Sequence, residues 1–151
     1  MISAQCGKYV TAIAPTAIID DASAVAAEID LQDAAYAEII LQLGATDIAI
    51  TALKLQESDT SGGSFVDVAG ATFDGGLNTE GVALALPSAT DDGQTLAFQV
   101  NAIGRKRFLK VVATFGNGTA GGFIAGVARL SSLGKVPTVD TSLASGGICR
   151  V

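Results

Sequence analysis

Histidine and tryptophan are absent from this sequence of 151 residues, and cysteine occurs only twice. Without histidine, the usual Ser-His-Asp and Cys-His nucleophilic arrangements cannot be built. Cys6 and Cys149 show neither C-x-x-C nor Cys/His spacing, so no metal site is expected from them. They could join the two ends in a disulfide, but two thiols in a reducing compartment are the preferred interpretation. We therefore predict a protein that is not an enzyme and uses no cofactor or metal.

Charged residues are also scarce, at 16% of the chain, whereas apolar residues make up 49%. Apolar surface that polar residues cannot cover tends to be covered by another subunit, so we expect an oligomer or a larger assembly. No apolar run approaches the length of a membrane span, and the N-terminal segment lacks the basic start of a secretory signal. We expect no membrane partner, and we expect synthesis and folding in the cytoplasm.

The few charges are divided unevenly along the chain. Residues 1–92 contain 14 acidic and 2 basic residues, whereas residues 93–151 contain 1 acidic and 7 basic residues. The first part therefore carries −12 and the second +6. Halves of opposite charge attract each other within a fold, between subunits or toward a charged partner. Pairing inside one domain or assembly is the favoured interpretation.

Period-two alternation of apolar and polar residues predicts antiparallel strands with one buried face. Residues 23–32 also favour a helix because of their Ala and Glu content, but they alternate and are predicted as a strand. The alternating segments are residues 36–45, 48–59, 95–103, 107–115 and 123–132.

Turn signals divide these strands into two expected pairs. A turn at residues 44–47 is expected to join the first pair, and a tight turn within residues 103–107 the second. Asn117-Gly118 is the best hairpin signal, because both residues tolerate positive φ. Residues 58–94 are rich in Gly, Ser, Thr and Asp and predict a loop with short strands near 65–68 and 71–73.

About eight short strands without βαβ alternation predict an all-β fold, namely an antiparallel β-sandwich or a jelly-roll-like barrel. We expect this domain to span residues 8–132. Residues 1–7 and 133–151 have no sustained period, and we expect them to be arms that order only against a partner.

Two pairs of adjacent carboxylates, Asp20-Asp21 and Asp91-Asp92, are the nearest approach to catalytic or calcium-binding groups. Adjacent acids on exposed turns are usually solvated, so neither role is expected. The "GNGTAGG" loop at 116–122 is not a phosphate loop, since no lysine follows it and it lies between strands.

The basic residues Arg105, Lys106, Arg107 and Lys110 form the one cationic cluster and the candidate interaction site. Nucleic-acid binding needs several phosphate contacts and usually aromatic side chains for stacking. Here only Phe108 is close, and the rest of the chain would repel a polyanion. We therefore predict that the cluster faces an acidic protein surface and not nucleic acid.

Three segments, in this order, resemble small proteins encoded in the head-gene clusters of tailed bacteriophages. They are "GATDIAITALKLQESDTSG", "ALPSATDDGQTLAFQV" and "GRKRFLKVVATFGNGTAGGFIAGVARLS". The resemblance covers about residues 36–132 and is to capsid decoration, or cement, proteins. It implies a β-sandwich subunit on the outside of an icosahedral head. It further implies a homotrimer bound to the lattice of the major capsid protein, without catalytic residues.

Two other function classes stay open. A head fibre, neck or tail component of a phage could use the same β-sandwich. A carbohydrate-binding module of jelly-roll type is less favoured, because such modules usually present Trp or Tyr to sugars. This chain has no Trp, and its only tyrosines are Tyr9 and Tyr36.

Overall fold

Eight β-strands and no helix make up the part of the chain that the computed structural model describes, residues 7–15, 17–78 and 80–131. Accordingly, no helix in these ranges could cross a membrane. The predicted arms, apart from Gly7, and both cysteines lie outside the described residues. The strands are β1 (Lys8–Ile13), β2 (Ile29–Asp30), β3 (Tyr36–Thr46), β4 (Ile50–Ser58), β5 (Val66–Phe73), β6 (Thr95–Asn101), β7 (Phe108–Phe115) and β8 (Gly122–Ser131).

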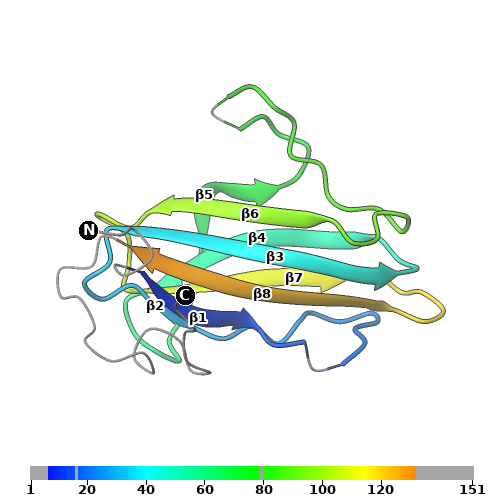
Figure 1. Ribbon diagram of the computed structural model, residues 1–151, viewed down its shortest axis with the longest axis horizontal. Helices are drawn as coiled ribbons and strands as arrows, with labels where there is room; N and C mark the ends of the chain where they lie inside the picture. Colours follow the sequence, from blue (N-terminus) through cyan, green and yellow to red (C-terminus); the bar gives the residue numbers. More distant parts are fainter. Residues whose placement is uncertain (1–6, 16, 79, 132–151) are drawn as a thin grey trace, which may run out of the picture.

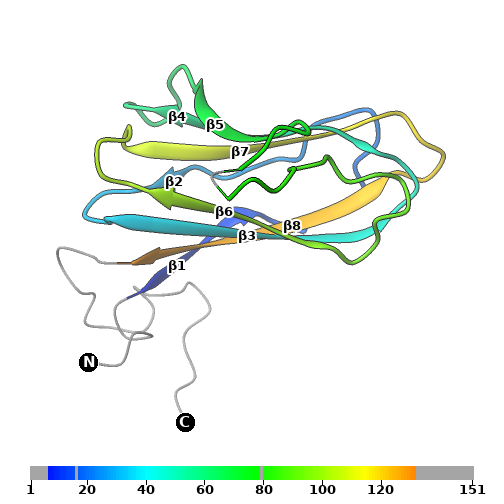
Figure 2. The ribbon, with the colours of Figure 1, turned by 90° about the horizontal axis from the view of Figure 1, so that it is seen from above.

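The strands form two antiparallel four-stranded sheets that pack face to face (Figures 1 and 2). Sheet A has the order β1-β8-β3-β6 and sheet B the order β2-β7-β4-β5. Pairing is nested, because β1 pairs with β8, β2 with β7, β3 with β6 and β4 with β5. In addition, β3 pairs with β8 and β4 with β7, and these contacts join the four strand pairs into two sheets. The predicted all-β antiparallel sandwich is confirmed.

The alternating residues of β3 show how the sequence builds the core. Ala37, Ile39, Leu41 and Leu43 are all at most 1% exposed, whereas the residues between them face outward. Successive side chains of a strand point to opposite faces, so this alternation places one row of each strand between the sheets. The same pattern buries Leu53 and Leu55 of β4, Phe98 and Val100 of β6, and Leu109, Val111 and Ala113 of β7.

The predicted pairing of neighbouring strands is wrong, although the strands themselves are present. β3 lies in sheet A and β4 in sheet B, and β6 and β7 are divided in the same way. The short connection after Thr46 therefore carries the chain from one sheet to the other. Among the described strands, β4–β5 is the one pair of consecutive strands that share a sheet. Alternation reports which face of a strand is buried and carries no information about its neighbour.

The predicted Asn117-Gly118 hairpin is also wrong, because residues 116–121 connect β7 in sheet B to β8 in sheet A. Neither residue has the positive φ that the predicted turn requires. Gly118 is instead required by close packing, since a Cβ added there would overlap the Cγ2 atom of Ile48.

The predicted strand at 23–32 is reduced to the two residues of β2. The expected alternation of buried and exposed residues is not kept along this segment. Ala24 and Ile29 are buried, whereas Val25, which the alternation places on the same side as Ile29, is 84% exposed. The reason is that this segment bonds to both sheets in turn. The amide of Ala24 donates to Ala113 of sheet B, and that of Ala27 donates to Ala12 of sheet A. The segment thus closes the side of the sandwich where β1 and β2 are the edges (Figure 2).

Candidate protein-interaction site

The predicted basic cluster lies at one end of the sandwich, where residues 102–107 carry the chain from β6 to β7 (left in Figure 1). Arg105, Lys106 and Arg107 lie in this connection, and Arg107, predicted as the first residue of a strand, directly precedes β7. Lys110 lies on β7, on the outer face of sheet B. The structure therefore brings all four predicted site residues to the same end of the molecule.

Arg107 makes the best-defined contact of the cluster. Its Nε and Nη2 atoms donate to the two carboxylate oxygens of Asp30 at 2.9 and 2.8 Å. Nη2 also donates to the side-chain oxygen of Gln32 at 2.6 Å, and the guanidinium lies 5.1 Å from the ring centre of Phe108. Two parallel bonds fix the guanidinium more firmly than a single charge contact would. Bonding to Arg107 lowers the pKa of Asp30, and the same pair raises the pKa of Arg107.

Arg105 and Lys106 pair with acids that lie at the end of β4 and just beyond it. Arg105 Nη1 lies 3.8 Å from Glu57, and Lys106 Nζ lies 3.5 Å from Asp59. The backbone amide of Lys106 also donates to Glu57 at 3.4 Å. Ion pairs as exposed as that of Lys106 add little stability, so their main effect is to neutralise this end of the molecule.

Lys110 is held differently, above an aromatic ring. Its Nζ atom lies 5.7 Å from the ring centre of Phe65. Nearby, Glu28 accepts hydrogen bonds from the Ser61 hydroxyl at 2.7 Å and the Gly62 amide at 2.8 Å. These two bonds lower the pKa of Glu28, and the charge of Lys110 adds to the effect. The basic end is therefore tied to acids of the N-terminal part of the same chain, which agrees with the favoured interpretation of the charge asymmetry.

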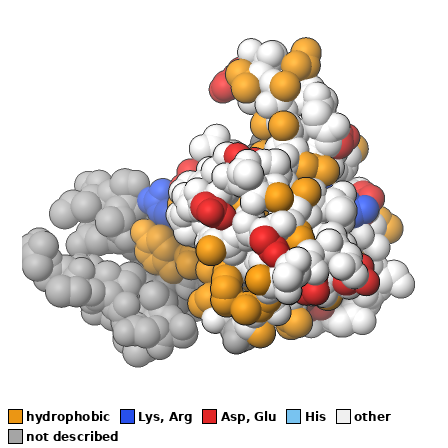
Figure 3. Space-filling model, turned by 90° about the vertical axis from the view of Figure 1, so that its right-hand side faces the viewer, with side chains coloured by type: hydrophobic (Ala, Val, Ile, Leu, Met, Phe, Trp, Pro, Cys, Tyr) orange, Lys and Arg blue, Asp and Glu red, His pale blue; other side chains and the backbone are white. Residues whose placement is uncertain are grey.

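The opposite end of the sandwich is acidic. Its loops contain Asp20, Asp21, Asp47, Asp91 and Asp92 and no Lys or Arg, and Figure 3 looks onto this end. Among the described residues, no group of three or more His, Cys, Asp or Glu side chains could hold a metal ion.

Four of these aspartates bind backbone amides. Asp47 accepts from Thr119, Ala120 and Gly121 at 2.7 to 2.9 Å, and Asp20 accepts from Gly118 at 2.7 Å. Asp92 accepts from the amide of Thr46, and Asp91 from that of Ser88. The bonds from Ala120, Thr119 and Gly121 lower the pKa of Asp47. These carboxylates organise the loops between the two sheets, a role that the sequence patterns did not indicate.

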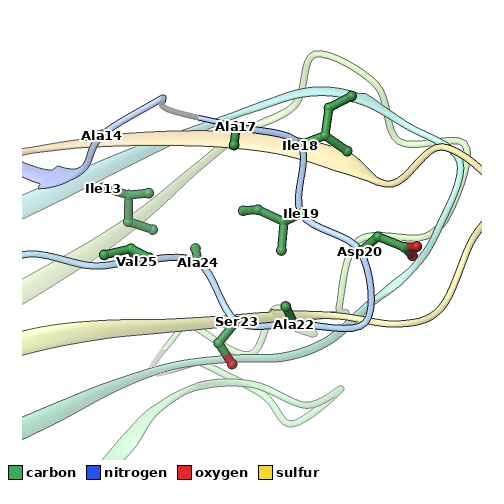
Figure 4. A pocket seen from close by; sticks show the side chains of 10 residues that line it. All are labelled: Ile13, Ala14, Ala17, Ile18, Ile19, Asp20, Ala22, Ser23, Ala24 and Val25. Carbon is green, nitrogen blue, oxygen red and sulfur yellow. The ribbon is translucent and has the colours of Figure 1, made fainter.

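A small, partly open cavity of about 210 Å³, lined mostly by Ala and Ile, lies beside the segment that follows β1. Figure 4 shows Ile13, Ile19 and Ala24 directed into this space, whereas Asp20 points away from it. The hydroxyl of Ser23 is bonded to that of Thr114 at 2.7 Å. The polar side chains of the described lining residues, Asp20 and Ser23, therefore do not converge on one point in the cavity.

The outer face of sheet A is a second candidate surface, which sequence reasoning missed. The strand register places Thr11, Val127, Ile40 and Ala97 in one row across all four strands. Ile40 is 42% and Val127 48% exposed, and Phe123 further along β8 is 42% exposed. The next row of this face carries Glu38 opposite Arg129, and the outer face of sheet B carries Lys54, bonded to Asp67 at 2.6 Å, and Lys110, so it is the row itself that is uncharged. The signal in the sequence is the presence of Ile40 and Val127 at positions where the alternation calls for polar side chains.

Comparison of the chain with protein-family models, with curated proteins and with solved structures gave no significant match in any of the three.

Proposed function

We propose that the chain is a structural protein of a tailed-bacteriophage virion, a decoration or cement protein. In this proposal it binds the outside of the head as a homotrimer and stabilises the lattice of the major capsid protein. Three ordered segments within residues 36–132 support the proposal by their resemblance to such proteins.

The connectivity of the strands is compatible with this role. We infer that the nested pairing of β1 with β8 through β4 with β5 is a jelly-roll winding. Eight-stranded, two-sheet jelly rolls are common in viral capsid and lectin domains. A fold alone does not define a function, so the proposal depends on a surface that suits the role.

The observation that carries the proposal is the uncharged row Thr11–Val127–Ile40–Ala97 on the outer face of sheet A. A sheet face with half-exposed Ile and Val suits contact with another protein, since burying apolar area contributes about 25 cal/mol per Å² before ordering costs. Several such contacts on one lattice strengthen one another through effective concentration. No comparable row of exposed apolar side chains crosses the described part of sheet B.

The basic cluster has a limited part in this proposal. Arg105, Lys106 and Arg107 already have acidic partners in the same chain. An acidic surface of a neighbouring subunit or of the capsid shell would have to bind these cations while they also pair with Glu57, Asp59 and Asp30. The predicted contact of the cluster with an acidic partner surface therefore stays a prediction.

Quantitative mass spectrometry of purified particles tests the proposal and its main alternative together. A decoration protein is present in numbers comparable with those of the major capsid protein, whereas a neck component is present in only a few copies. A head-fibre or tail component is distinguished by its location on the particle, seen by electron microscopy. A low copy number would contradict the decoration role, and absence from the particle would contradict any role in the virion.

A further inference from the structure

The four edges of the two sheets are protected to very different degrees. Unpaired edge strands are templates for pairing with another chain, and proteins protect them by bulges, charges, short length or cover. β1 has a register shift and is bridged at Ile13 by Ala26, and β2 has only two residues. The pairing of β5 with β4 has a register shift between Lys54 and Gln56 of β4, and Gly70 of β5 has a φ of 77°. These three edges are poor templates for another strand.

Within the described part of the chain, the edge strand β6 has no bulge, no charge and no hydrogen-bonded covering segment. It pairs with β3 through seven consecutive residues without a register shift. Its sequence, TLAFQVN, contains no charged residue, proline or glycine. Among the backbone hydrogen bonds of the described residues outside the sheet ladders, none joins another segment to the outer side of β6 within residues 95–101.

The alternation of hydrogen-bonded pairs between β3 and β6 shows which backbone groups of β6 point away from β3. Leu43 donates to Gln94, and Ala102 donates to Ala35, so these opposite residues are hydrogen-bonded pairs. In an antiparallel ladder such pairs alternate, so the even-numbered residues of β6 bond to β3. The N–H and C=O groups of Ala97 and Gln99 therefore point away from β3, into the open side of the sandwich.

A groove of about 470 Å³ lies at this open side. Its walls include Ala97–Val100 of β6, Gly70–Phe73 of β5, and Leu77 and Leu84. The last two belong to the described residues of 74–86, here called the projection, which stands out from the sandwich in Figures 1 and 3. Phe73 and Phe98 pack edge to face in the groove wall, with ring centres 5.2 Å apart.

The projection is built by bonds within itself, such as Gly75 to Leu84 and Asn78 to Val82. It leaves Leu77 72% and Val82 56% exposed. Of these two side chains, Leu77 lines the groove beside β6.

The size and charge of the groove define what fits it. One strand residue occupies about 160 Å³, from a rise of ~3.3 Å, a strand spacing of ~4.8 Å and a sheet spacing of ~10 Å. The groove therefore has room for about three residues of a single extended chain. Glu80 is the one ionisable residue among the residues that line the groove, and the lining contains no Lys or Arg.

We propose that this groove binds an extended segment of a partner polypeptide, which adds as a strand to the edge of β6. Main-chain hydrogen bonds to Ala97 and Gln99 provide affinity, and small apolar side chains at alternate positions face Phe98 and Leu77. A Lys or Arg in the segment pairs with Glu80. The inference does not depend on the phage proposal, because it is argued from the edge of β6 and the groove beside it.

Titration of the full chain with a fluorescein-labelled peptide, Lys-Val-Thr-Val-Lys-Val, tests this by fluorescence anisotropy. We expect saturable binding at up to millimolar peptide. The same peptide with N-methyl groups on alternate amides should bind roughly tenfold more weakly for each ladder bond lost. A peptide with Glu in place of Lys should bind more weakly to the natural chain and better to Glu80→Lys.

Variants of the protein provide the second arm. Gln99→Pro removes one outward N–H, and proline is tolerated at an edge where the N–H faces solvent, so we expect a folded protein with at least a roughly tenfold weaker interaction. Leu77→Thr should also weaken binding, whereas Ile103→Thr, which removes a similarly exposed side chain outside the groove, should not. Lack of binding by any peptide, or equal binding by the N-methylated peptide, would overturn the proposal. So would a dimer that Gln99→Pro dissociates, since a second copy would then occupy the edge.

Discussion

Arg107 binds Asp30 through two hydrogen bonds, of 2.9 and 2.8 Å, across 77 residues of sequence. This pair joins the basic C-terminal part of the chain to its acidic N-terminal part at one end of the sandwich. It also connects two sheet-joining segments, the one that contains β2 and the one that precedes β7. The charge asymmetry of the sequence therefore serves, at least at this end, to hold the fold's own connections together.

The Arg107–Asp30 pair should show coupling in a double-mutant cycle. Arg107→Gln and Asp30→Asn should each lower the melting temperature, and the double variant should lose less than the sum of the two. The same cycle on Lys106 and Asp59, which lie 3.5 Å apart in a single contact, should show weaker coupling. Equal coupling in both cycles would contradict the importance given to the bidentate geometry. Thermal unfolding measured by circular dichroism gives all these values.

Asp47 should make the protein sensitive to acid. Backbone amides of Ala120, Thr119 and Gly121 lower its pKa from the ordinary value of 3.8, so the folded state favours the ionised carboxylate. The stabilisation is then fully present above pH 3.8 and is lost as the pH falls through the lower pKa of the folded state. Asp47→Asn should be less stable near neutral pH and should lose less stability below pH 3.8 than the natural chain. Parallel pH-dependences in urea unfolding would show that Asp47 contributes nothing.

Gly118 and Asn117 should respond differently to replacement by alanine. Gly118→Ala places a Cβ against Ile48, which is only 4% exposed, and should cost about 1–3 kcal/mol of unfolding free energy. Asn117→Ala changes an exposed residue without positive φ and should stay within about 0.5 kcal/mol. A type I′ turn would instead penalise both replacements through backbone strain. Chemical denaturation of the two variants therefore separates the observed crossing loop from the hairpin.

Replacing the neighbouring residues Leu41 and Ile40 of β3 by alanine should lower the unfolding free energy by different amounts. Leu41 is fully buried, so Leu41→Ala should cost about 2–5 kcal/mol. Ile40 is 42% exposed on the outer face of sheet A, and Ile40→Ala should cost less than about 1 kcal/mol. A large loss for Ile40→Ala in the isolated chain would mean that Ile40 is already covered by another copy in solution. Urea unfolding at two protein concentrations distinguishes that case, because an oligomer's stability depends on concentration.

The strands could be predicted from the sequence because burial of one face leaves a local pattern. The buried positions of β3, β4, β6 and β7 follow from period two. Pairing could not be predicted, because it depends on connections that pass between sheets, such as the one after Thr46. The sequence has no local sign that Asp47 will bind amides more than seventy residues away.

The candidate sites were predictable to different degrees. The position of Arg105–Arg107 in a connection follows from the alternation on either side, but their partners Asp30, Glu57 and Asp59 are brought close only by the fold. The apolar row of sheet A requires the register of four strands. The open edge of β6 requires the order of the sheet, which no local pattern contains.

Binding to undecorated phage heads tests the proposed function most directly. The natural chain should co-sediment with heads assembled from the major capsid protein. Ile40→Glu/Val127→Lys should lose this binding while staying folded, because the two new side chains lie opposite each other and form a cross-strand pair of opposite charge. Val66→Lys, which adds a charge at an equally exposed position of sheet B, should bind like the natural chain. Failure of the natural chain to co-sediment, or undiminished binding by the double variant, would contradict the account.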